Sequence, residues 1–170
     1  MKYEINYEIF DMEKHGQLAE QAAVVQAADM AANPATVSML PYTLETFQQC
    51  PLGAIASTTH GEFVGFNGVI YQYETGEWEQ GGLYVAPQFR GHGVAWELKI
   101  VFIDAAKAAA AGKRLITFVG PTSESINKKF GFTETDSFPA EALEFCATCP
   151  KSKCLPVGKV CCSKVLEIQL

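Results

Sequence analysis

Two hydrophobic periods follow each other in the first third of the chain. Residues 2–10 alternate between apolar and polar side chains, which is the pattern of a β-strand with one buried face. From residue 11 to about 32 the apolar residues recur every three or four positions, which predicts a helix capped by Asp11 and ended before Pro34. A shorter helix is expected over residues 43–49, so the chain is predicted to begin with one strand and two helices.

The middle of the chain predicts an antiparallel meander followed by a helix. Three strand-like segments are separated by short glycine-containing turns, and they cover residues 52–58, 62–73 and 77–85. Between residues 94 and 111 the apolar positions form a helical stripe, and Gly112 is placed to end that helix. We therefore expect three strands that pair in sequence order, and then one long helix.

The last third of the chain is predicted to hold three more strands and one more helix. Thr122 or Ser123 is expected to cap a short helix that ends at Gly131. The strands are expected at residues 115–119, 132–135 and 165–169. In total the pattern predicts about seven strands and about four helices, an α+β chain that forms a single domain over residues 1–170.

The composition agrees with a globular chain. Hydrophobic residues make up 48% of the 170 residues and charged residues 19%, which excludes a disordered or fibrous chain. No apolar run approaches the roughly 18 residues of a membrane helix, and the first residues lack the apolar core of a signal peptide. We therefore expect a cytoplasmic protein with reduced thiols and no membrane partner, although a secreted chain whose leader had been removed would look the same. His15 and His60 are expected at the surface.

The net charge of −6 is unevenly distributed along the chain. Residues 1–89 carry eleven acids and two lysines, whereas residues 90–170 carry eight acids and eleven bases. An acidic half suits a cationic partner and a basic half an anionic one, so a site between them could hold both; the alternative is a solvated surface with chance asymmetry. The strongly basic character of a nucleic-acid-binding protein is absent.

Arg90-Gly91-His92-Gly93 joins the third strand of the predicted meander to the long helix. A glycine-rich turn at this place leaves unpaired amides at the positive end of the helix dipole and lets the backbone approach an anion closely. Arg90 would add a charged fork, so the sequence predicts a phosphate site, with a plain tight turn as the alternative. The GxxxxGK[ST] loop is absent, and Trp96 stands where a dinucleotide fingerprint needs its third glycine.

The turn and a later segment resemble the two signature blocks of the GNAT superfamily of acyl-CoA N-acyltransferases. The second block, a serine followed eight residues later by Gly-Phe, is similar to residues 123–132, and residues 83–87 resemble the family's fourth strand and its exit. The first block is Arg/Gln-x-x-Gly-x-Gly/Ala at the start of a central helix. It is matched by two overlapping sets of residues, which are Gln88, Gly91 and Gly93, and Arg90, Gly93 and Ala95.

This resemblance implies a GNAT fold with a mixed, mostly antiparallel sheet, and acetyl-CoA or another acyl-CoA as cosubstrate. In the family the cofactor lies where the fourth and fifth strands splay apart, and an amide of the fourth strand polarises the thioester carbonyl. The cofactor contacts that the resemblance implies are Tyr84 and Val85 along the pantetheine arm, Arg90, Gly91, His92, Gly93, Val94 and Ala95 at the pyrophosphate, and Ser123 and Asn127 in the second block.

Catalysis in this family requires that a base remove a proton from the acceptor, because an ammonium has no lone pair with which to attack. Relatives often use a glutamate of the fourth strand, and Glu77 and Glu79 are the candidates here because they lie two residues apart; the alternative is that both face solvent. Relatives also often place a tyrosine four residues after the second-block serine to protonate the thiolate, but this chain has Asn127. Water or another residue such as Tyr84 must then supply that proton.

Residues 144–164, approximately, are interpreted as a cysteine-rich insertion between the last two strands, because they hold five of the six cysteines. Their spacing resembles compact zinc sites, in which a CxxC pair and a later pair bind a structural Zn²⁺ with no open position for water. The alternatives are disulfides or a thiol-rich hairpin without a ligand. The candidate zinc ligands are Cys146, Cys149, Cys154 and Cys161, with Cys162 as the alternate fourth.

Three functional hypotheses follow from these observations. The first is an N-acetyltransferase that moves an acetyl group from acetyl-CoA to a primary amine of a small molecule, a peptide or a protein. The second is a non-catalytic acyl-CoA-binding or interaction protein on the same fold. The third is an adaptor that acts through a zinc-bound cysteine-rich segment. No motif in the sequence identifies the acceptor amine or the oligomeric state.

Overall fold

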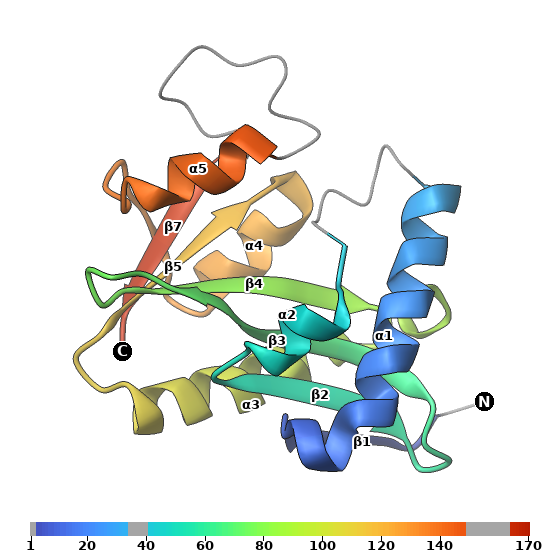
Figure 1. The fold of residues 1–170 in the computed structure, drawn as a ribbon. Helices are drawn as coiled ribbons and strands as arrows, with labels where there is room; N and C mark the ends of the chain where they lie inside the picture. Colours follow the sequence, from blue (N-terminus) through green and yellow to red (C-terminus); the bar gives the residue numbers. More distant parts are fainter. Residues whose placement is uncertain (1–2, 34–40, 149–163) are drawn as a thin grey trace. The chain divides into compact units, whose positions relative to one another are not determined.

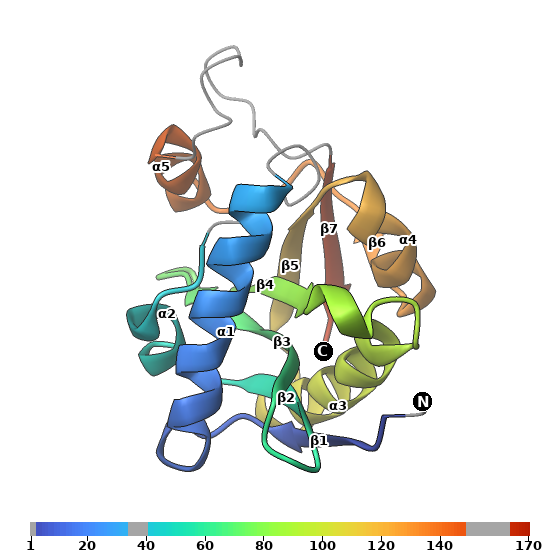
Figure 2. The same cartoon turned by 90° about the vertical axis from the view of Figure 1, so that its right-hand side faces the viewer.

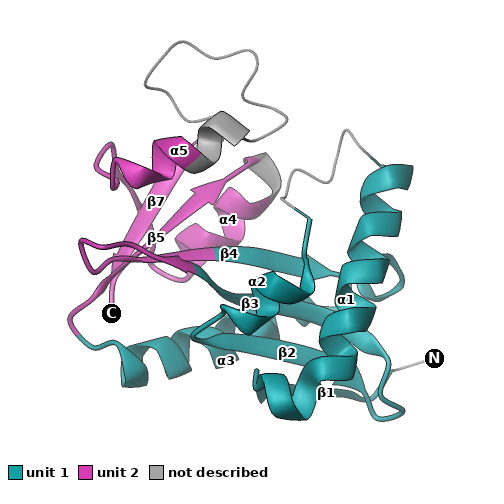
Figure 3. Cartoon of the chain, in the orientation of Figure 1, with its two compact units in different colours: residues 1–70, 81–111 teal, residues 71–80, 112–170 magenta. Residues whose placement is uncertain are grey.

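The computed structural model describes residues 3–33, 41–148 and 164–170. They form two compact units, one made of residues 1–70 and 81–111 and the other of residues 71–80 and 112–170 (Figure 3). The prediction of one domain with an insertion at about residues 144–164 stays a prediction, because most of that insertion lies outside the described residues.

The strands form one seven-stranded sheet in the order β1-β2-β3-β4-β5-β7-β6 (Figure 1). Their bounds are Ile5–Ile9 for β1, Gly53–Thr58 for β2, Phe63–Gln72 for β3, Trp78–Val85 for β4, Arg114–Val119 for β5, Thr133–Glu134 for β6 and Lys164–Gln169 for β7. β4 pairs with β5 in parallel, whereas the pairs β1–β2, β2–β3, β5–β7 and β6–β7 are antiparallel. The prediction of a mixed sheet of about seven strands is therefore confirmed.

The first unit is built on β1, β2 and most of β3. Its helices are α1 (Met12–Ala32), α2 (Leu44–Gln48), the short 3₁₀ helix η1 (Pro87–Phe89) and α3 (Val94–Ala109). α1 and α3 lie on opposite faces of β1, β2 and β3 (Figure 2). Phe66 of β3 packs against the rings of Phe10, Tyr42 and Phe47 at centroid distances of 5.4, 5.7 and 4.9 Å. This aromatic cluster anchors α2 and the start of α1 on the sheet.

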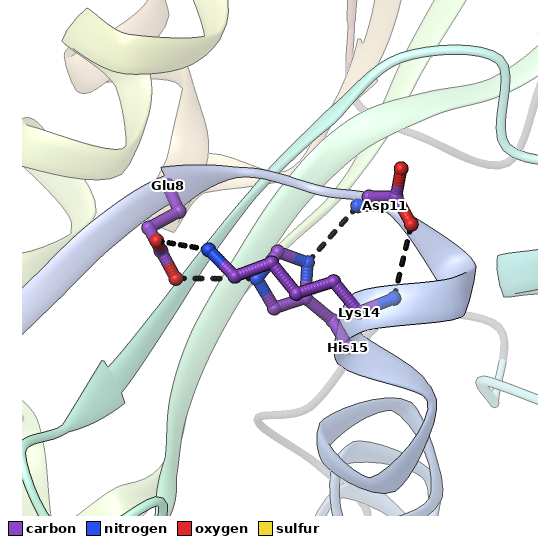
Figure 4. Close-up of polar contacts among 4 residues, drawn as sticks. All are labelled: Glu8, Asp11, Lys14 and His15. Carbon is purple, nitrogen blue, oxygen red and sulfur yellow. Dashed lines mark hydrogen bonds and ion pairs between the residues drawn. The ribbon is translucent and has the colours of Figure 1, made fainter.

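A polar cluster fixes the beginning of α1 (Figure 4). Asp11 caps the helix, as predicted, by accepting a hydrogen bond from the amide of Lys14 at 3.0 Å. The amide of Asp11 donates to Nδ1 of His15 at 3.0 Å, so Nε2 of His15 carries the proton and lies 3.2 Å from a carboxylate oxygen of Glu8. Lys14 completes an ion pair with Glu8. His15 is only 3% exposed and stacks on Phe10, so the expectation that it lies at the surface is wrong.

The second unit is built on β5, β6 and β7 together with residues 71–80. Its helices are α4 (Pro121–Lys129) and α5 (Glu141–Thr148), which lie on opposite faces of β5 and β7 (Figure 2). β5 and β7 pair along their whole length, and β4 joins β5 through the pairs Trp78 with Leu115 and Glu79 with Ile116. Ala142 of α5 packs against Tyr73 and Ile116 to form a small core.

The helices agree with the expectation of about four, except in where one of them begins. The described residues form five α-helices, and the additional one, α5, occupies a segment that the sequence pattern left without structure. The helix expected to begin after Thr122 or Ser123 begins at Pro121 with Gly120 as its N-cap. Proline is well suited to the first helical position, since the amide that it lacks would have no partner in the helix there. None of the helices in the described ranges could span a membrane.

Candidate functional site

The glycine turn between β4 and α3 has the geometry of an anion site. Gly91 and Gly93 have φ angles of 79° and 80°, a conformation that other residues rarely adopt, and apart from their chain neighbours no described atom lies within 4 Å of where a Cβ would stand on either. Gly93 is the N-cap of α3 and no side chain caps the helix. In the described part of the chain, the amides of residues 91–95 donate to no other group. These amides are therefore available to an anion at the positive end of the α3 dipole.

Arg90 precedes this turn, and its side chain is held by groups of the protein itself. Its Nε donates to the carbonyl of Val85 at 2.9 Å, and its guanidinium lies 5.6 Å from the centre of the Tyr84 ring. Its Nη2 forms an ion pair with the carboxylate of Asp29 in the last turns of α1. The sequence predicted that the guanidinium of Arg90 would bind an anionic ligand, whereas in this structure it binds the carboxylate of Asp29.

Asp29 is the residue of this site that the sequence analysis missed. Its side chain is 1% exposed and accepts hydrogen bonds from Tyr84 Oη at 3.1 Å, from Asn33 Nδ2 at 3.0 Å and from Arg90. Burial alone would raise the pKa of Asp29, but these three hydrogen bonds outweigh it and keep the pKa below its usual value. The only sequence signal was an acid close to the C-terminus of a helix, where the dipole disfavours negative charge and where α1 carries no base.

Tyr84 lies in β4 with its hydroxyl directed to Asp29. The side chain is buried, and burial followed by the neighbouring Asp29 carboxylate raises the pKa of Tyr84. A phenol with a raised pKa that already donates its proton to a carboxylate is a poor acid for a leaving thiolate. The role of Tyr84 as a proton donor stays a prediction, and this geometry does not favour it.

The two glutamates predicted as bases have different environments in the second unit. Glu79 lies in β4, beside Ile116, and accepts a hydrogen bond from Tyr73 Oη. Burial raises the pKa of Glu79 to about 7, against the opposing effect of Tyr73. Glu77 lies one residue before β4 and forms an ion pair with Arg114 at 3.1 Å. A hydrogen bond from Thr75 lowers the pKa of Glu77, and burial opposes this effect. The contact with Arg114 lowers the pKa further. Glu79 is therefore the better base at neutral pH.

Ser123 and Asn127 of the second signature block lie on consecutive turns of α4. The Ser123 hydroxyl donates to the carbonyl of Gly120 at 3.3 Å, and Asn127 Nδ2 donates to the carbonyl of Ser123 at 2.8 Å. Asn127 is 2% exposed, so its amide serves the packing of α4. Their predicted contacts with a cofactor stay predictions.

The predicted zinc ligands lie almost entirely outside the described residues. Cys149, Cys154, Cys161 and Cys162 are outside them, and of Cys146 only the backbone is described, in α5. Within the described ranges, no group of three or more histidine, cysteine, aspartate or glutamate side chains could hold a metal ion. The zinc site and its disulfide alternative both stay predictions.

Similar folds occur among solved acetyltransferase structures. N-acetylglutamate synthase from Neisseria gonorrhoeae, complexed with coenzyme A and N-acetyl-glutamate, aligns with all of this chain and 36% of its own at 17% identity and a TM-score of 0.66. A GNAT-family acetyltransferase from Staphylococcus aureus Mu50 covers 96% of this chain and 97% of its own at 14% identity and a TM-score of 0.57. A GNAT-family N-acetyltransferase from Escherichia coli in complex with CoA covers 97% of this chain and 82% of its own at 14% identity and a TM-score of 0.54. These likenesses show the fold.

The sequence itself identifies the family. No curated protein is similar enough in sequence to count as a match. The sequence model of the acetyltransferase (GNAT) family, however, matches residues 23–132, which include the second half of α1, the strands β2 to β5, the glycine turn and α4. The match therefore covers both signature blocks and well over half of the chain. This chain belongs to the acetyltransferase (GNAT) family.

Proposed function

We propose that this protein is an N-acetyltransferase that moves an acetyl group from acetyl-CoA to a primary amine of a small molecule, a peptide or a protein. The observation that carries the proposal is the turn at Gly91 and Gly93 at the start of α3, whose amides donate to no other group among the described residues. The family match and the structures of relatives bound to CoA support the same cosubstrate.

The first unit would bind the cofactor. Amides of Gly91, His92, Gly93, Val94 and Ala95 hold the pyrophosphate, because together they offer several donors and a helix dipole to one anion. Backbone groups of β4 near Tyr84 and Val85 pair with the pantetheine arm. An amide on this strand donates to the thioester carbonyl and stabilises the negative charge that its oxygen gains during attack.

Glu79 would act as the base of the reaction. Its carboxylate takes a proton from the acceptor ammonium, directly or through water, and the neutral amine then attacks the thioester carbon. The carbon–sulfur bond breaks and the acetyl group forms an amide with the acceptor, whose nitrogen gives up its second proton to water. CoA leaves as a thiolate that takes a proton from water. A pKa of about 7 suits this task, because Glu79 is then partly ionised at neutral pH and still basic enough to accept the proton.

Acyl-CoA binding without turnover is the second candidate function. Two observations favour it, since Asn127 occupies the position where relatives often carry a tyrosine, and the hydroxyl of Tyr84 is engaged with Asp29. The third hypothesis, an adaptor acting through a zinc-bound segment, rests on residues outside the described ranges. A cytoplasmic location remains the expectation from the sequence.

Calorimetry with acetyl-CoA tests the cofactor site. Gly93→Asp places a carboxylate against the pyrophosphate and should weaken binding by about a hundredfold or more. Gly61→Asp is the matched control, because Gly61 has a φ of 79°, has equally open space around its Cβ position and lies in the turn between β2 and β3. Unchanged affinity in Gly93→Asp would remove the cofactor assignment.

Release of free thiol from acetyl-CoA in the presence of an amine panel tests catalysis. Release with any member of the panel supports the transferase. Tight binding of acetyl-CoA without release across small-molecule, peptide and protein amines supports the non-catalytic binder.

A further inference from the structure

We propose that Asp29 and Arg90 form a strut that fixes the glycine turn in its binding conformation, so that Asp29 is a positioning residue for the cofactor pyrophosphate although it does not contact it. The part of this inference that concerns affinity rests on the proposed function. The geometric part rests on contacts within the first unit alone.

Arg90 is tied to two different elements of the first unit, β4 and α1, by three contacts. Its Nε bonds to the end of β4 at the Val85 carbonyl, its guanidinium lies against the Tyr84 ring, and its Nη2 binds Asp29 on α1. Guanidinium is a planar group with donors in fixed directions, so a bond to a carbonyl and a bond to a carboxylate together set the orientation of the whole side chain. The backbone of residue 90, which starts the turn, is fixed with it.

Asp29 is well placed to be the fixed end of this strut. It is buried, and its carboxylate joins Asn33 at the end of α1, Tyr84 in β4 and Arg90 at the turn. A buried carboxylate near a helix C-terminus is unfavourable by itself, because burial and the helix dipole both oppose its charge. Its three donors compensate for this, and the only cationic one among them is Arg90.

The turn needs such support. Gly91 and Gly93 have no atom within 4 Å of their Cβ positions, so packing does not restrict them, and glycine has more backbone freedom to lose than any other residue. Phe89 and Val94 are buried and hold the two ends of the turn. Between them, as far as the structure describes the chain, Arg90 carries the only charged link to another element. A turn that is already ordered binds its anion more tightly, because less entropy is lost on binding.

The strut and a direct Arg90–phosphate contact make opposite predictions about Asp29. If Arg90 bound the phosphate, Asp29 would compete for the same guanidinium, and Asp29→Asn would leave the affinity for CoA unchanged or raise it. If Arg90 acts as a strut, Asp29→Asn and Arg90→Gln remove the same interaction, and each should weaken binding. The double variant should then be no weaker than either single variant.

The test is a double-mutant cycle on the full chain with CoA as the titrant in calorimetry. We expect Asp29→Asn, Arg90→Gln and the double variant each to weaken CoA binding by about tenfold, within the range of coupling between directly paired residues. Arg90→Lys should not rescue binding, because an ammonium carries its donors on a single nitrogen and cannot reproduce the Nε and Nη2 contacts of the planar guanidinium. Lys14→Gln is the control, since it breaks the ion pair with Glu8 at the opposite end of α1 and should leave affinity unchanged.

Kinetic and folding measurements distinguish a positioning role of Asp29 from a general loss of stability in its variants. A strut raises the KM for acetyl-CoA and leaves kcat at saturation and the KM for the amine unchanged, whereas general destabilisation would lower kcat as active enzyme is lost. If Asp29→Asn leaves the arginine charge unpaired and fails to fold, the double variant carries neither charge and still shows whether affinity falls. Unchanged or tighter binding in Asp29→Asn, or additive losses in the double variant, would overturn the strut.

Failure of the proposed function gives a different result. If the parent protein binds no acyl-CoA, the cofactor assignment fails, and the strut is then read from hydrogen–deuterium exchange. Asp29→Asn should speed exchange at residues 90–95 and leave exchange in the β2–β3 turn unchanged. Equal exchange at residues 90–95 in parent and variant would overturn the geometric part of the proposal.

Discussion

Replacing Glu79 with glutamine is expected to make the protein more stable at pH 8 while making it a poorer catalyst. Burial raises the pKa of Glu79 from 4.5 to about 7, so the folded protein binds this proton more tightly than the unfolded chain does. The stability that protonated Glu79 contributes is fully present below pH 4.5 and is lost as the pH rises through about 7. Integrated over that interval, the loss amounts to about 3 kcal/mol.

Urea unfolding at pH 5 and pH 8 measures this effect. Glutamine has nearly the same shape, can still accept the hydrogen bond from Tyr73, and stays neutral at both pH values. The free energy of unfolding of Glu79→Gln should therefore exceed that of the parent at pH 8 by about 3 kcal/mol, and the difference should shrink to about 1 kcal/mol at pH 5.

Glu77→Gln is the matched control, because it removes the same charge two residues away. The pKa of Glu77 is lowered by Thr75 and by the ion pair with Arg114, so its contribution to stability is present above its unfolded pKa and is lost as the pH falls through its folded pKa. This variant should be less stable than the parent at pH 8. The loss should be smaller than the gain in Glu79→Gln, since partly exposed ion pairs contribute little.

The same substitution should remove the base. We expect kcat/KM of Glu79→Gln to fall by about a hundredfold or more, and we expect partial recovery at high pH, where more of the amine is already neutral. In the parent, kcat/KM should fall by about tenfold for each pH unit below 7, as the carboxylate is lost. If Glu79→Gln shows the same difference in stability between pH 5 and pH 8 as the parent, the carboxyl is not a buried acid. If it keeps the parent's rate, another group is the base.

Three further predictions follow from individual contacts and from the cysteine spacing. Tyr73→Phe removes the hydrogen bond that lowers the pKa of Glu79, so the acid limb of the pH–rate profile should move to higher pH, and an unmoved profile would contradict the contact. Gly82→Ala should lower the free energy of unfolding by about 2 kcal/mol or more, because φ is +68° there and a Cβ would lie 2.5 Å from the Tyr42 hydroxyl. Urea denaturation measures this loss. A smaller loss than in Gly76→Ala, where the space around the Cβ position is open, would refute the close approach. Elemental analysis of protein purified without chelator should find about one zinc per chain, whereas less than about a tenth of an equivalent with every thiol titrating would exclude the site, and missing thiols would indicate disulfides. The predicted ligands are Cys146, Cys149, Cys154, Cys161 and Cys162.

The strands and the longer helices could be predicted because their signals are local. The glycine-containing turns locate β2, β3 and β4 within one residue, and alternation locates β1 within three. α5 could not be predicted in the same way, since the helix is short and lies beside the cysteines that dominate its segment. Its burial depends on Ala142 meeting Tyr73 and Ile116, which are distant in sequence. No periodicity within eight residues contains that information.

The candidate site likewise contains features that a local pattern reveals and contacts that only the fold creates. The glycine turn is a property of consecutive residues, so the sequence located it. The carboxylate that binds Arg90 is 61 residues away, in a helix whose own pattern gives no reason to single out Asp29. Tyr73 is an intermediate case, because it and Glu79 flank the short turn between β3 and β4 and are six residues apart. Cross-strand pairs beside a tight turn face one another, so this contact was accessible to sequence reasoning.

Ion pairs within the protein account for part of the uneven distribution of charge along the chain. The sequence contains only two arginines, Arg90 and Arg114, and both lie in the basic half. Each forms an ion pair with an acid of the acidic half in its own unit, Arg90 with Asp29 and Arg114 with Glu77. Arg114 also binds Glu167 at 2.5 Å, so its guanidinium is shared between two carboxylates. Arginine suits such positions because its fork can join two acceptors at once and stays charged when partly buried. The arginines therefore hold elements of each unit together, and the proposed pyrophosphate site relies on the backbone amides at the start of α3.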